Sequence, residues 1–225
     1  MVDGFKEYQE KERKAYLKYA RELLRLDEMS VFEREYSNLQ YICGIDEAGR
    51  GPLAGPVVAG AIVLPKDEPI LYLNDSKKLS PKMRERLMHE IVEKCIACGA
   101  GIIDAPRIDE INILQATYEA MRLAIKGLLI KPDILLVDAV TIPDVEYKQV
   151  PIIKGDAKSI SIAAASILAK VHRDRMMVHY DDEYPEYGFA KHKGYGTPEH
   201  IAALKKYGPC PIHRKTFIRK ILEGK

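Results

Sequence analysis

Residues 41–65, YICGIDEAGRGPLAGPVVAGAIVLP, mark a change of period in the sequence and indicate the fold class of the chain. The first part, YICGIDE, is a short apolar strand that ends in two acidic residues. The last part, PVVAGAIVLP, predicts a second strand because it is rich in β-branched residues and is bracketed by Pro56 and Pro65. The sequence therefore places two strands in close succession, joined by a glycine-rich segment, residues 49–55 (GRGPLAG).

Helices and strands alternate along the rest of the chain. A helix is expected from Pro81, with Ser80 as its N-cap, and a third strand is expected to end at Asp104. Three strands nearly in succession, followed by strands that alternate with helices, predict an α/β fold with a mixed sheet and helices on its faces. The remaining predicted elements are a helix over 109–128, a buried strand over 134–139, a strand within 145–155, an alanine-rich helix over 157–180 and a short helix after Pro198.

The N-terminal segment predicts a separate helical element. Within residues 5–28, apolar side chains recur at helical spacing among alternating acids and bases, at Tyr16, Tyr19, Leu23 and Leu26. We expect this amphipathic helix to pack on the main domain as an appendage. The sequence thus divides into an N-terminal helical extension, residues 1–38, and a main domain, residues 39–225, that ends in a basic helical segment.

Composition excludes several classes of protein. The chain has 225 residues, of which 47% are hydrophobic and 30% are charged, as is usual for a globular protein with a full core. Four cysteines in a chain of this length make no disulfide framework. No apolar run is long enough to cross a bilayer, and the N-terminus lacks the apolar region of a signal peptide. We therefore expect a cytoplasmic protein with no membrane partner.

Charge is distributed unevenly. From Lys191 to the end the chain carries nine Lys or Arg residues and two acids, a net charge of +7. The net charge of the whole chain is +2, so residues 1–190 carry −5. A basic tail on a slightly acidic body is typical of a protein that binds a polyanion and keeps a carboxylate cluster elsewhere. A solvated basic surface without a partner is the alternative.

Four carboxylates lie at ends of predicted elements. Asp46 and Glu47 end the first strand, Asp138 ends the strand over 134–139, and Asp156 precedes the alanine-rich helix. If Asp138 lies on a neighbouring strand, it can converge with Asp46. The glycines after the first strand allow the backbone to turn Glu47 toward the same cleft. Clustered carboxylate oxygens bind hard divalent cations such as Mg²⁺ or Mn²⁺, and without a cation they repel one another.

Each carboxylate also has an ordinary structural alternative. Asp156 is well placed to be a helix N-cap. Asp138 could pair with a base at the end of its strand, and Glu47 could be solvated. The set of four, each beside a helix or strand end, favours a metal site over these separate explanations.

The glycine-rich segment favours contact with a ligand. Gly49 and Gly51 can bring backbone N–H groups close to a ligand, and the guanidinium of Arg50 can donate a forked pair of hydrogen bonds to phosphate. A dinucleotide-binding site would require a helix next, whereas a strand follows, so that function is disfavoured. The structural alternative is a tight turn with Arg50 in solvent.

Further candidate contacts to nucleic acid lie outside the glycine-rich segment. Ser166, Lys170 and Arg173 share one face of the alanine-rich helix and could follow a phosphate backbone. Lys77 belongs to a second basic stretch, before a helix, and Tyr195 lies between two glycines and could stack on a sugar or base. A solvated helix end and a turn with Tyr195 packed on the domain edge are the structural alternatives.

Taken together, the motifs closely resemble those of the bacterial ribonuclease HII family. They occur in the order of that family from Tyr41 to Phe217, and the ordered set is much more specific than any single member. The matching stretches are ICGIDEAGRGPLAGPVVAGAIVLP, NDSKKLS, INILQATYEAM, LLVDA, KGDAKSISIAAASILAKVHRDRMM, HKGYGT and PIHRKTF.

The resemblance implies a fold and a set of residue roles. The fold would be ribonuclease H-like, a five-stranded mixed sheet flanked by helices, and the acidic tetrad would be Asp46, Glu47, Asp138 and Asp156. The segment Gly49–Gly51 would recognise the 2′-hydroxyl and phosphate at an RNA–DNA junction, and Tyr195 would stack on the sugar beside it. The related ribonuclease HIII family carries a larger N-terminal domain, which the short segment 1–38 does not resemble.

The function implied is an endoribonuclease of RNA–DNA hybrids that also cuts 5′ of a single ribonucleotide in duplex DNA, as in ribonucleotide excision repair. Two Mg²⁺ or Mn²⁺ ions, bridged by the carboxylates, would hydrolyse the phosphodiester and leave 5′-phosphate and 3′-hydroxyl ends. We expect a monomer. The alternatives are a DNA nuclease of the same fold, of the resolvase or integrase type, and a duplex-binding protein without catalysis.

Overall fold

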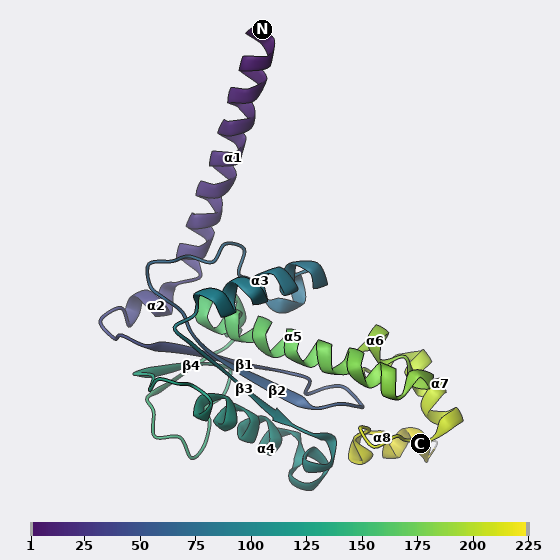
Figure 1. Ribbon diagram of the computed structural model, residues 1–225. Coiled ribbons are helices and arrows are strands. Elements are labelled where there is room, and N and C mark those ends of the chain that lie inside the picture. Colours follow the sequence, from purple (N-terminus) through teal and green to yellow (C-terminus); the bar gives the residue numbers. More distant parts are fainter. Residues whose placement is uncertain (1, 224–225) are drawn as a thin grey trace.

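The computed structural model describes residues 2–223, with side chains from residue 9 onward, and contains a five-stranded mixed sheet. The strand order is β3-β2-β1-β4-β5; β1 pairs antiparallel with β2 and parallel with β4. The predicted α/β class, with a mixed sheet flanked by helices, is confirmed (Figure 1). The strand bounds are β1 Ile42–Ala48, β2 Val57–Val63, β3 Ala97–Ile103, β4 Ile134–Asp138 and β5 Gln149–Ile152.

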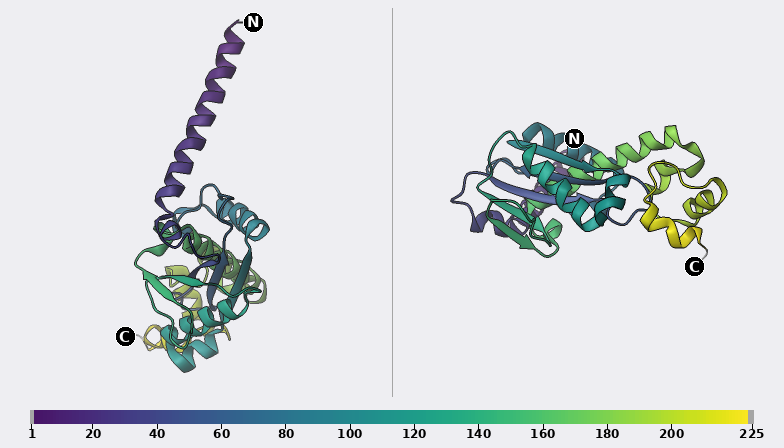
Figure 2. Two further views of the ribbon diagram at one scale, coloured as in Figure 1. Left: turned by 90° about the vertical axis from the view of Figure 1, so that its left-hand side faces the viewer. Right: turned by 90° about the horizontal axis from the view of Figure 1, so that it is seen from below.

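Helices cover both faces of the sheet (Figures 1 and 2). Helix α4 covers one face, and α5 with α3 covers the other. The helix bounds are α1 Val2–Glu28, α2 Val31–Glu35, α3 Pro81–Lys94, α4 Ala105–Lys126, α5 Ile160–Glu183, α6 Phe189–His192, α7 Pro198–Tyr207 and α8 Lys215–Leu222, with 3₁₀ turns η1 Ser76–Lys78, η2 Gly155–Ala157 and η3 Pro185–Tyr187. Among these described helices, none is long and apolar enough to span a membrane.

Alternation along β1 explains how the sheet is held between two helical layers. Cys43 and Ile45 point into the core formed with α4, and both are fully buried. Gly44 faces α5, where a Cβ atom would lie only 2.1 Å from the backbone carbon of Ser161. A side chain at this position would push α5 off the sheet, so the glycine allows the close helix–strand contact that places the N-terminus of α5 beside the end of β4.

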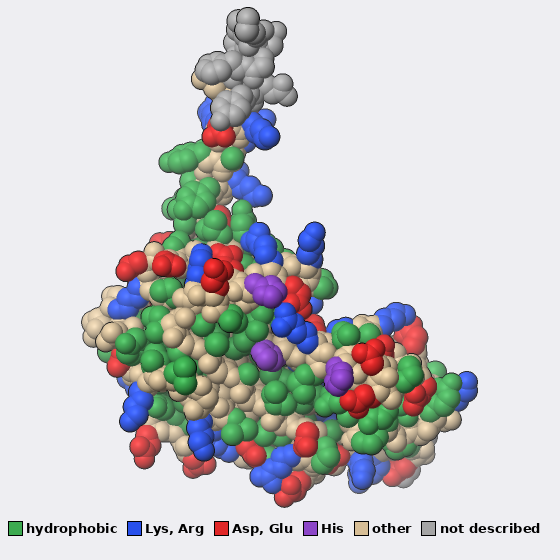
Figure 3. Space-filling view, viewed as in Figure 1, with side chains coloured by type: hydrophobic (Ala, Val, Ile, Leu, Met, Phe, Trp, Pro, Cys, Tyr) green, Lys and Arg blue, Asp and Glu red, His purple; other side chains and the backbone are tan. Residues whose placement is uncertain are grey.

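The N-terminal helix α1 packs on the main domain over only part of its described length. Among the side chains described from residue 9 onward, those of α1 that are buried lie in its last turns: Leu26 is 5% exposed, and buried Glu22 accepts a 2.7 Å hydrogen bond from the backbone N–H of Tyr72. Earlier along α1, Tyr16 is 70% and Tyr19 is 47% exposed, and hydrophobic side chains cover part of the projecting helix (Figure 3). The prediction that this apolar face packs on the main domain is therefore wrong for the first part of α1, which extends away from the sheet (Figure 2).

Candidate active site

Asp46 and Asp138 lie side by side toward the carboxyl ends of the adjacent parallel strands β1 and β4. The parallel pairing of β1 with β4 aligns Ile45 with Val137, and the next residues along the two strands are Asp46 and Asp138. Asp46 is 6% exposed and its Oδ1 accepts a 2.7 Å hydrogen bond from the backbone N–H of Glu47. The expected convergence of Asp46 with a carboxylate on a neighbouring strand thus follows from the register.

Burial and neighbouring negative charge raise the pKa values of Asp46 and Glu47. Burial raises the pKa of Asp46 well above its usual range, and the charges of Glu47 and Asp138 raise it further. Burial also raises the pKa of Glu47, and Asp138 adds to the rise, whereas the neighbouring Arg50, whose Nη1 lies 3.5 Å from Glu47 Oε1, opposes it. The carboxylates are therefore close enough to disfavour one another's ionised forms.

Asp156 joins the cluster from the turn before α5. It lies in η2, and its pKa is raised by burial and by the charges of Asp75 and Asp138. The N-cap of α5 is Ser159, whose hydroxyl accepts a hydrogen bond from the N–H of Ile162. The alternative role of Asp156 as the N-cap is therefore wrong, and its side chain is left to contribute to the acidic cluster.

Lys77 faces the same cluster from the turn before α3. The side chain of Asp75 caps this turn by accepting a 2.9 Å hydrogen bond from the N–H of Lys77. Burial lowers the pKa of Lys77, but the charges of Asp156, Asp46, Asp75 and Asp138 together outweigh burial and the net shift is upward. Lys77 is thus a cation beside the carboxylates, and Asp75 is a neighbour that the sequence analysis did not single out.

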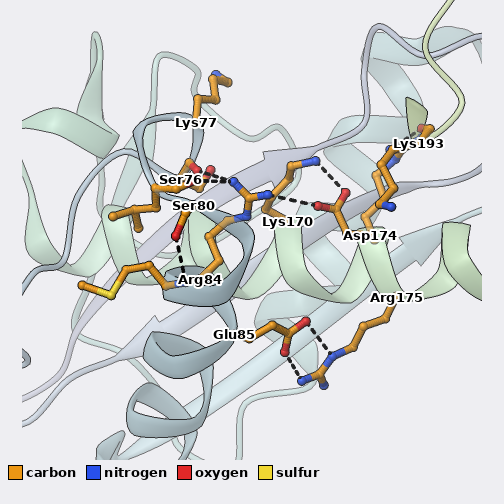
Figure 4. A network of polar contacts seen from close by, with 12 residues as sticks. Ser76, Lys77, Ser80, Arg84, Glu85, Lys170, Asp174, Arg175 and Lys193 are labelled. Atoms are coloured by element: carbon orange, nitrogen blue, oxygen red, sulfur yellow. Dashed lines mark hydrogen bonds and ion pairs between the residues drawn. The ribbon is translucent and has the colours of Figure 1, made fainter. Parts of the chain in front are cut away.

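Two of the helix-face candidates are already engaged within the protein. Ser166 is 4% exposed and shares a 2.9 Å hydrogen bond with the hydroxyl of Ser76. Lys170 donates a 2.6 Å hydrogen bond to Asp174, which also pairs with Arg84 (Figure 4). Both side chains therefore already have partners within the protein, and the burial of Ser166 limits its direct contact with a phosphate backbone.

Arg173 has a different role from the predicted one. Its side chain is 1% exposed, and the guanidinium donates to the backbone carbonyls of Pro56, Lys193 and Ala54 at 2.9–3.0 Å. The prediction that Arg173 lies on a phosphate-binding surface is therefore wrong. It is a structural residue that joins the end of the glycine-rich segment to the segment before Tyr195.

The glycine-rich segment and Tyr195 lie next to each other. A Cβ atom at Gly51 would lie 3.8 Å from Tyr195 Cε1, and the tyrosine side chain is 47% exposed. Gly49 has a φ of +98°, and a Cβ atom there would lie 2.1 Å from the guanidinium Nε of Arg173. A side chain at Gly49 is thus excluded both by backbone conformation and by space. The glycine-rich segment and Tyr195, which lie far apart in the sequence, therefore form one surface beside Glu47.

Three buried histidines support the backbone of Tyr195. His200 Nδ1 donates a 2.9 Å hydrogen bond to the carbonyl of Tyr195, so its Nε2 is the acceptor of a 3.0 Å bond from His213 Nε2. The ring of His192 stacks on that of His200 with centroids 4.4 Å apart. None of these roles was apparent from the sequence, since the scattered histidines show no spacing that links them.

The acidic cluster fits hard divalent cations by its chemistry. Its potential ligand atoms are all carboxylate oxygens. The charges of Glu47 and Asp138 raise the pKa of Asp46, and the charge of Asp138 raises the pKa of Glu47, a repulsion that a cation relieves. Within residues 9–223 no three His, Cys, Asp or Glu side chains already surround a common ion position.

Comparison with known proteins places these features in one family. The sequence profile described as "Ribonuclease HII" matches residues 43–220. A ribonuclease HII from Lachnoclostridium phytofermentans is 59% identical over 219 residues, which cover 97% of this chain and 86% of the relative.

Solved structures share the fold. Ribonuclease H2 from Pyrococcus horikoshii OT3 has a TM-score of 0.68 and 31% identity, and the match covers 82% of this chain and 98% of that one. The Mn²⁺ complex of Bst-RNase HIII has a TM-score of 0.55 and 16% identity, over 75% of this chain and 63% of that one, and its likeness concerns the fold.

Proposed function

The chain belongs to the ribonuclease HII family, and on that premise we propose that it is an endoribonuclease of RNA–DNA hybrids that also cuts 5′ of single ribonucleotides in duplex DNA. It is a hydrolase of phosphodiester bonds, and the proposed products carry 5′-phosphate and 3′-hydroxyl ends. The observation that carries the proposal is the alignment of Asp46 with Asp138 on adjacent parallel strands, with Glu47 and Asp156 close enough that the charge of Asp138 raises the pKa of each.

The proposed metal ligands are the four carboxylates Asp46, Glu47, Asp138 and Asp156. Divalent cations held there supply Lewis acidity for the hydrolysis of a phosphodiester. The all-oxygen ligand set supports Mg²⁺ or Mn²⁺, two per active complex, and the Mn²⁺ bound by Bst-RNase HIII agrees with a divalent cation. Lys77, which is electrostatically coupled to the cluster, is placed to attract the phosphate.

Recognition of the ribonucleotide is assigned to the surface beside Glu47. Only the 2′-hydroxyl distinguishes RNA from DNA locally, so a backbone that can approach the sugar closely is required. Gly49 and Gly51 provide such a backbone, Arg50 offers its guanidinium to phosphate, and the half-exposed ring of Tyr195 beside Gly51 can stack on the sugar. Ser166 and Lys170 then support the site from beneath.

The remaining parts of the proposal concern the whole molecule. We assign residues 39–225 to the catalytic domain and residues 1–38 to an extension, and propose that the protein acts as a monomer in the cytoplasm during ribonucleotide excision repair. Its partners are RNA–DNA hybrids and duplex DNA that contains ribonucleotides. The exposed basic residues of the C-terminal segment support contact with the duplex.

A substrate panel tests the proposal. We expect cleavage of the RNA strand of an RNA–DNA hybrid in Mg²⁺, with no cleavage of a branched all-DNA junction or a linear all-DNA duplex. Cleavage of the branched junction would favour a resolvase-type nuclease instead. Tight binding of every duplex without cleavage in Mg²⁺ or Mn²⁺ would favour a binding protein.

A further inference from the structure

The guanidinium of Arg214 is fully buried beneath the glycine-rich segment. It donates to the carbonyl of Gly49 at 2.6 Å, to that of Arg50 at 2.9 Å, and to that of Gly55 at 2.9 and 3.0 Å. The side chain of Arg214 is 0% exposed. All its contacts to this segment are thus to backbone oxygens.

No carboxylate neutralises this charge at close range. Among residues 9–223 Arg214 forms no ion pair within 4.0 Å, and neither does Arg173, which lies beneath the same segment. Burial lowers the pKa of Arg214 to about 9 and the nearby charge of Arg173 contributes, whereas the charge of Asp109, which forms no ion pair with the guanidinium, opposes the fall. Buried charges in proteins are normally paired. Arg173 and Arg214 therefore favour binding of an anion on the exposed side of the glycine-rich segment.

The carbonyls that Arg214 binds determine where the neighbouring N–H groups point. In a trans peptide the C=O and the following N–H point in opposite directions. When the carbonyls of Gly49 and Arg50 point inward to the guanidinium, the N–H groups of Arg50 and Gly51 point outward. No acceptor for these two N–H groups is present among the described residues, and both residues are exposed.

We propose that Arg214 is a positioning residue for substrate recognition: by binding the Gly49 and Arg50 carbonyls it turns the Arg50 and Gly51 amides outward as donors to the ribonucleotide and its phosphate. The proposal rests on the proposed function, because it names how the recognition surface is held. Arg214 itself does not contact the substrate. Its positive charge also polarises the two peptide groups, which strengthens their N–H groups as donors.

The segment around Arg214 is built to hold this geometry. His213 pairs with Ala54 in a β-bridge, the N–H of Arg214 donates to the Leu53 carbonyl, and that of Gly55 donates to the Ile212 carbonyl. The residue before Arg214 also supports Tyr195, through the bond from His213 to His200. Two consecutive residues of the C-terminal segment therefore position both parts of the recognition surface.

Duplex binding separates positioning from simple stabilisation. We would compare wild type, Arg214→Lys and Arg214→Met, with Arg122→Met as the matched control on α4, across the sheet from α5. Affinities would be measured in Ca²⁺ for a duplex with one ribonucleotide and for an all-DNA duplex of the same sequence. Electrophoresis would verify that the duplex stays intact. A melting curve of each variant would establish that it is folded at the assay temperature.

The proposal predicts that Arg214→Met lowers the preference for the ribonucleotide duplex at least tenfold, while Arg122→Met leaves it unchanged. Arg214→Lys keeps the charge but cannot bind three carbonyls in fixed directions, so it should lose part of the preference. A folded Arg214→Met variant with wild-type preference would overturn the proposal alone. Absence of any preference in wild type would overturn the proposed mode of recognition as well.

A measurement on the unmodified protein covers the case in which Arg214→Met does not fold. In ¹⁵N-labelled wild type, the amide resonances of Arg50 and Gly51 should shift downfield when the ribonucleotide duplex is added, and less with the all-DNA duplex. Equal or absent shifts of these two amides with both duplexes would contradict the proposal.

Discussion

Asp138 and Gly155 are joined by a 2.7 Å hydrogen bond from the backbone N–H of Gly155 to Asp138 Oδ1. This bond connects the end of β4 to the turn that carries Asp156. The acidic cluster therefore depends on the conformation of this turn as well as on the identity of the carboxylates.

Substitution of Gly155 should disturb the cluster without removing a carboxylate. A Cβ atom there would lie 2.5 Å from Ile162 Cδ1 and 3.3 Å from Asp138 Oδ1, so both side chains must move in Gly155→Ala. We expect at least a threefold lower cleavage rate, measured at saturating substrate across a Mg²⁺ titration. Gly127→Ala is the control, because its Cβ would find its nearest neighbour at 3.4 Å. Equal rates for both variants would show that the turn does not affect the cluster.

Tyr195→Ala should slow cleavage of a duplex with one ribonucleotide at least tenfold. Loss of a stacking ring costs about 1–3 kcal/mol of positioning, and a scissile phosphate displaced by about an ångström reacts far more slowly. Tyr195→Phe should retain most of the activity, since stacking requires the ring. Tyr207→Ala, with a similarly exposed side chain of 51%, serves as the control. A folded Tyr195→Ala enzyme with the wild-type rate would remove this residue from the site.

Stability should fall in mild acid because of the buried histidines. Burial, with contributions from His200 and His192, lowers the pKa of His213 to about 4. Its folded-state pKa lies below the unfolded value of about 6.5, so the unfolded state binds more protons between these values and stability is lost as the pH falls. The loss from His213 should be on the order of 2 kcal/mol by pH 4, with partial screening taken into account.

Thermal unfolding from pH 7 to pH 4 measures this loss. In His213→Gln the melting temperature should depend less on pH, while His179→Gln, whose side chain is 73% exposed in the wild type, should behave as wild type. A pH dependence of His213→Gln as steep as that of wild type would assign the acid sensitivity to other groups.

The basic C-terminal segment should contribute to duplex affinity through counterion release. Truncation after Gly208 would also remove His213 and Arg214, so substitution of exposed residues is the cleaner change. We expect the Gln variants of Lys205, Lys206 and Lys220 to reduce the slope of log K against log salt by about 0.9 for each phosphate that is no longer neutralised. Lys126→Gln and Lys131→Gln, at the end of α4 and beyond it, are controls. An unchanged slope in all variants would mean that the segment is only a solvated surface.

The strands of the sheet could be predicted from the sequence because each is marked by a pattern within a few consecutive residues. A short apolar run that ends in two acids identifies β1, β-branched residues between two prolines identify β2, and the Ser80 cap with Pro81 identifies the start of α3. The periodic face of α1 was detected as well, but periodicity does not reveal whether another surface reaches it. Tyr16 is therefore exposed although its spacing predicts burial.

The candidate site was predictable only in part. Asp46 and Asp138 could be proposed because acids at strand ends carry a cost that demands an explanation. Arg173 was misinterpreted because helical spacing defines a face and not its neighbours. The roles of His213 and Arg214 depend on contacts with residues about 13 and 165 positions away, which no local pattern encodes.

Cleavage by carboxylate variants measures whether Asp46 and Asp138 hold the catalytic cations. Wild type, Asp46→Asn, Asp138→Asn and the exposed control Asp144→Asn would be incubated with an end-labelled duplex that contains one ribonucleotide, with and without Mg²⁺. We expect a single cut 5′ of the ribonucleotide by wild type and Asp144→Asn in Mg²⁺ only. Asp46→Asn and Asp138→Asn should bind the duplex without cutting it. Wild-type turnover by Asp46→Asn or Asp138→Asn at saturating Mg²⁺ would show that these carboxylates are not the catalytic metal ligands.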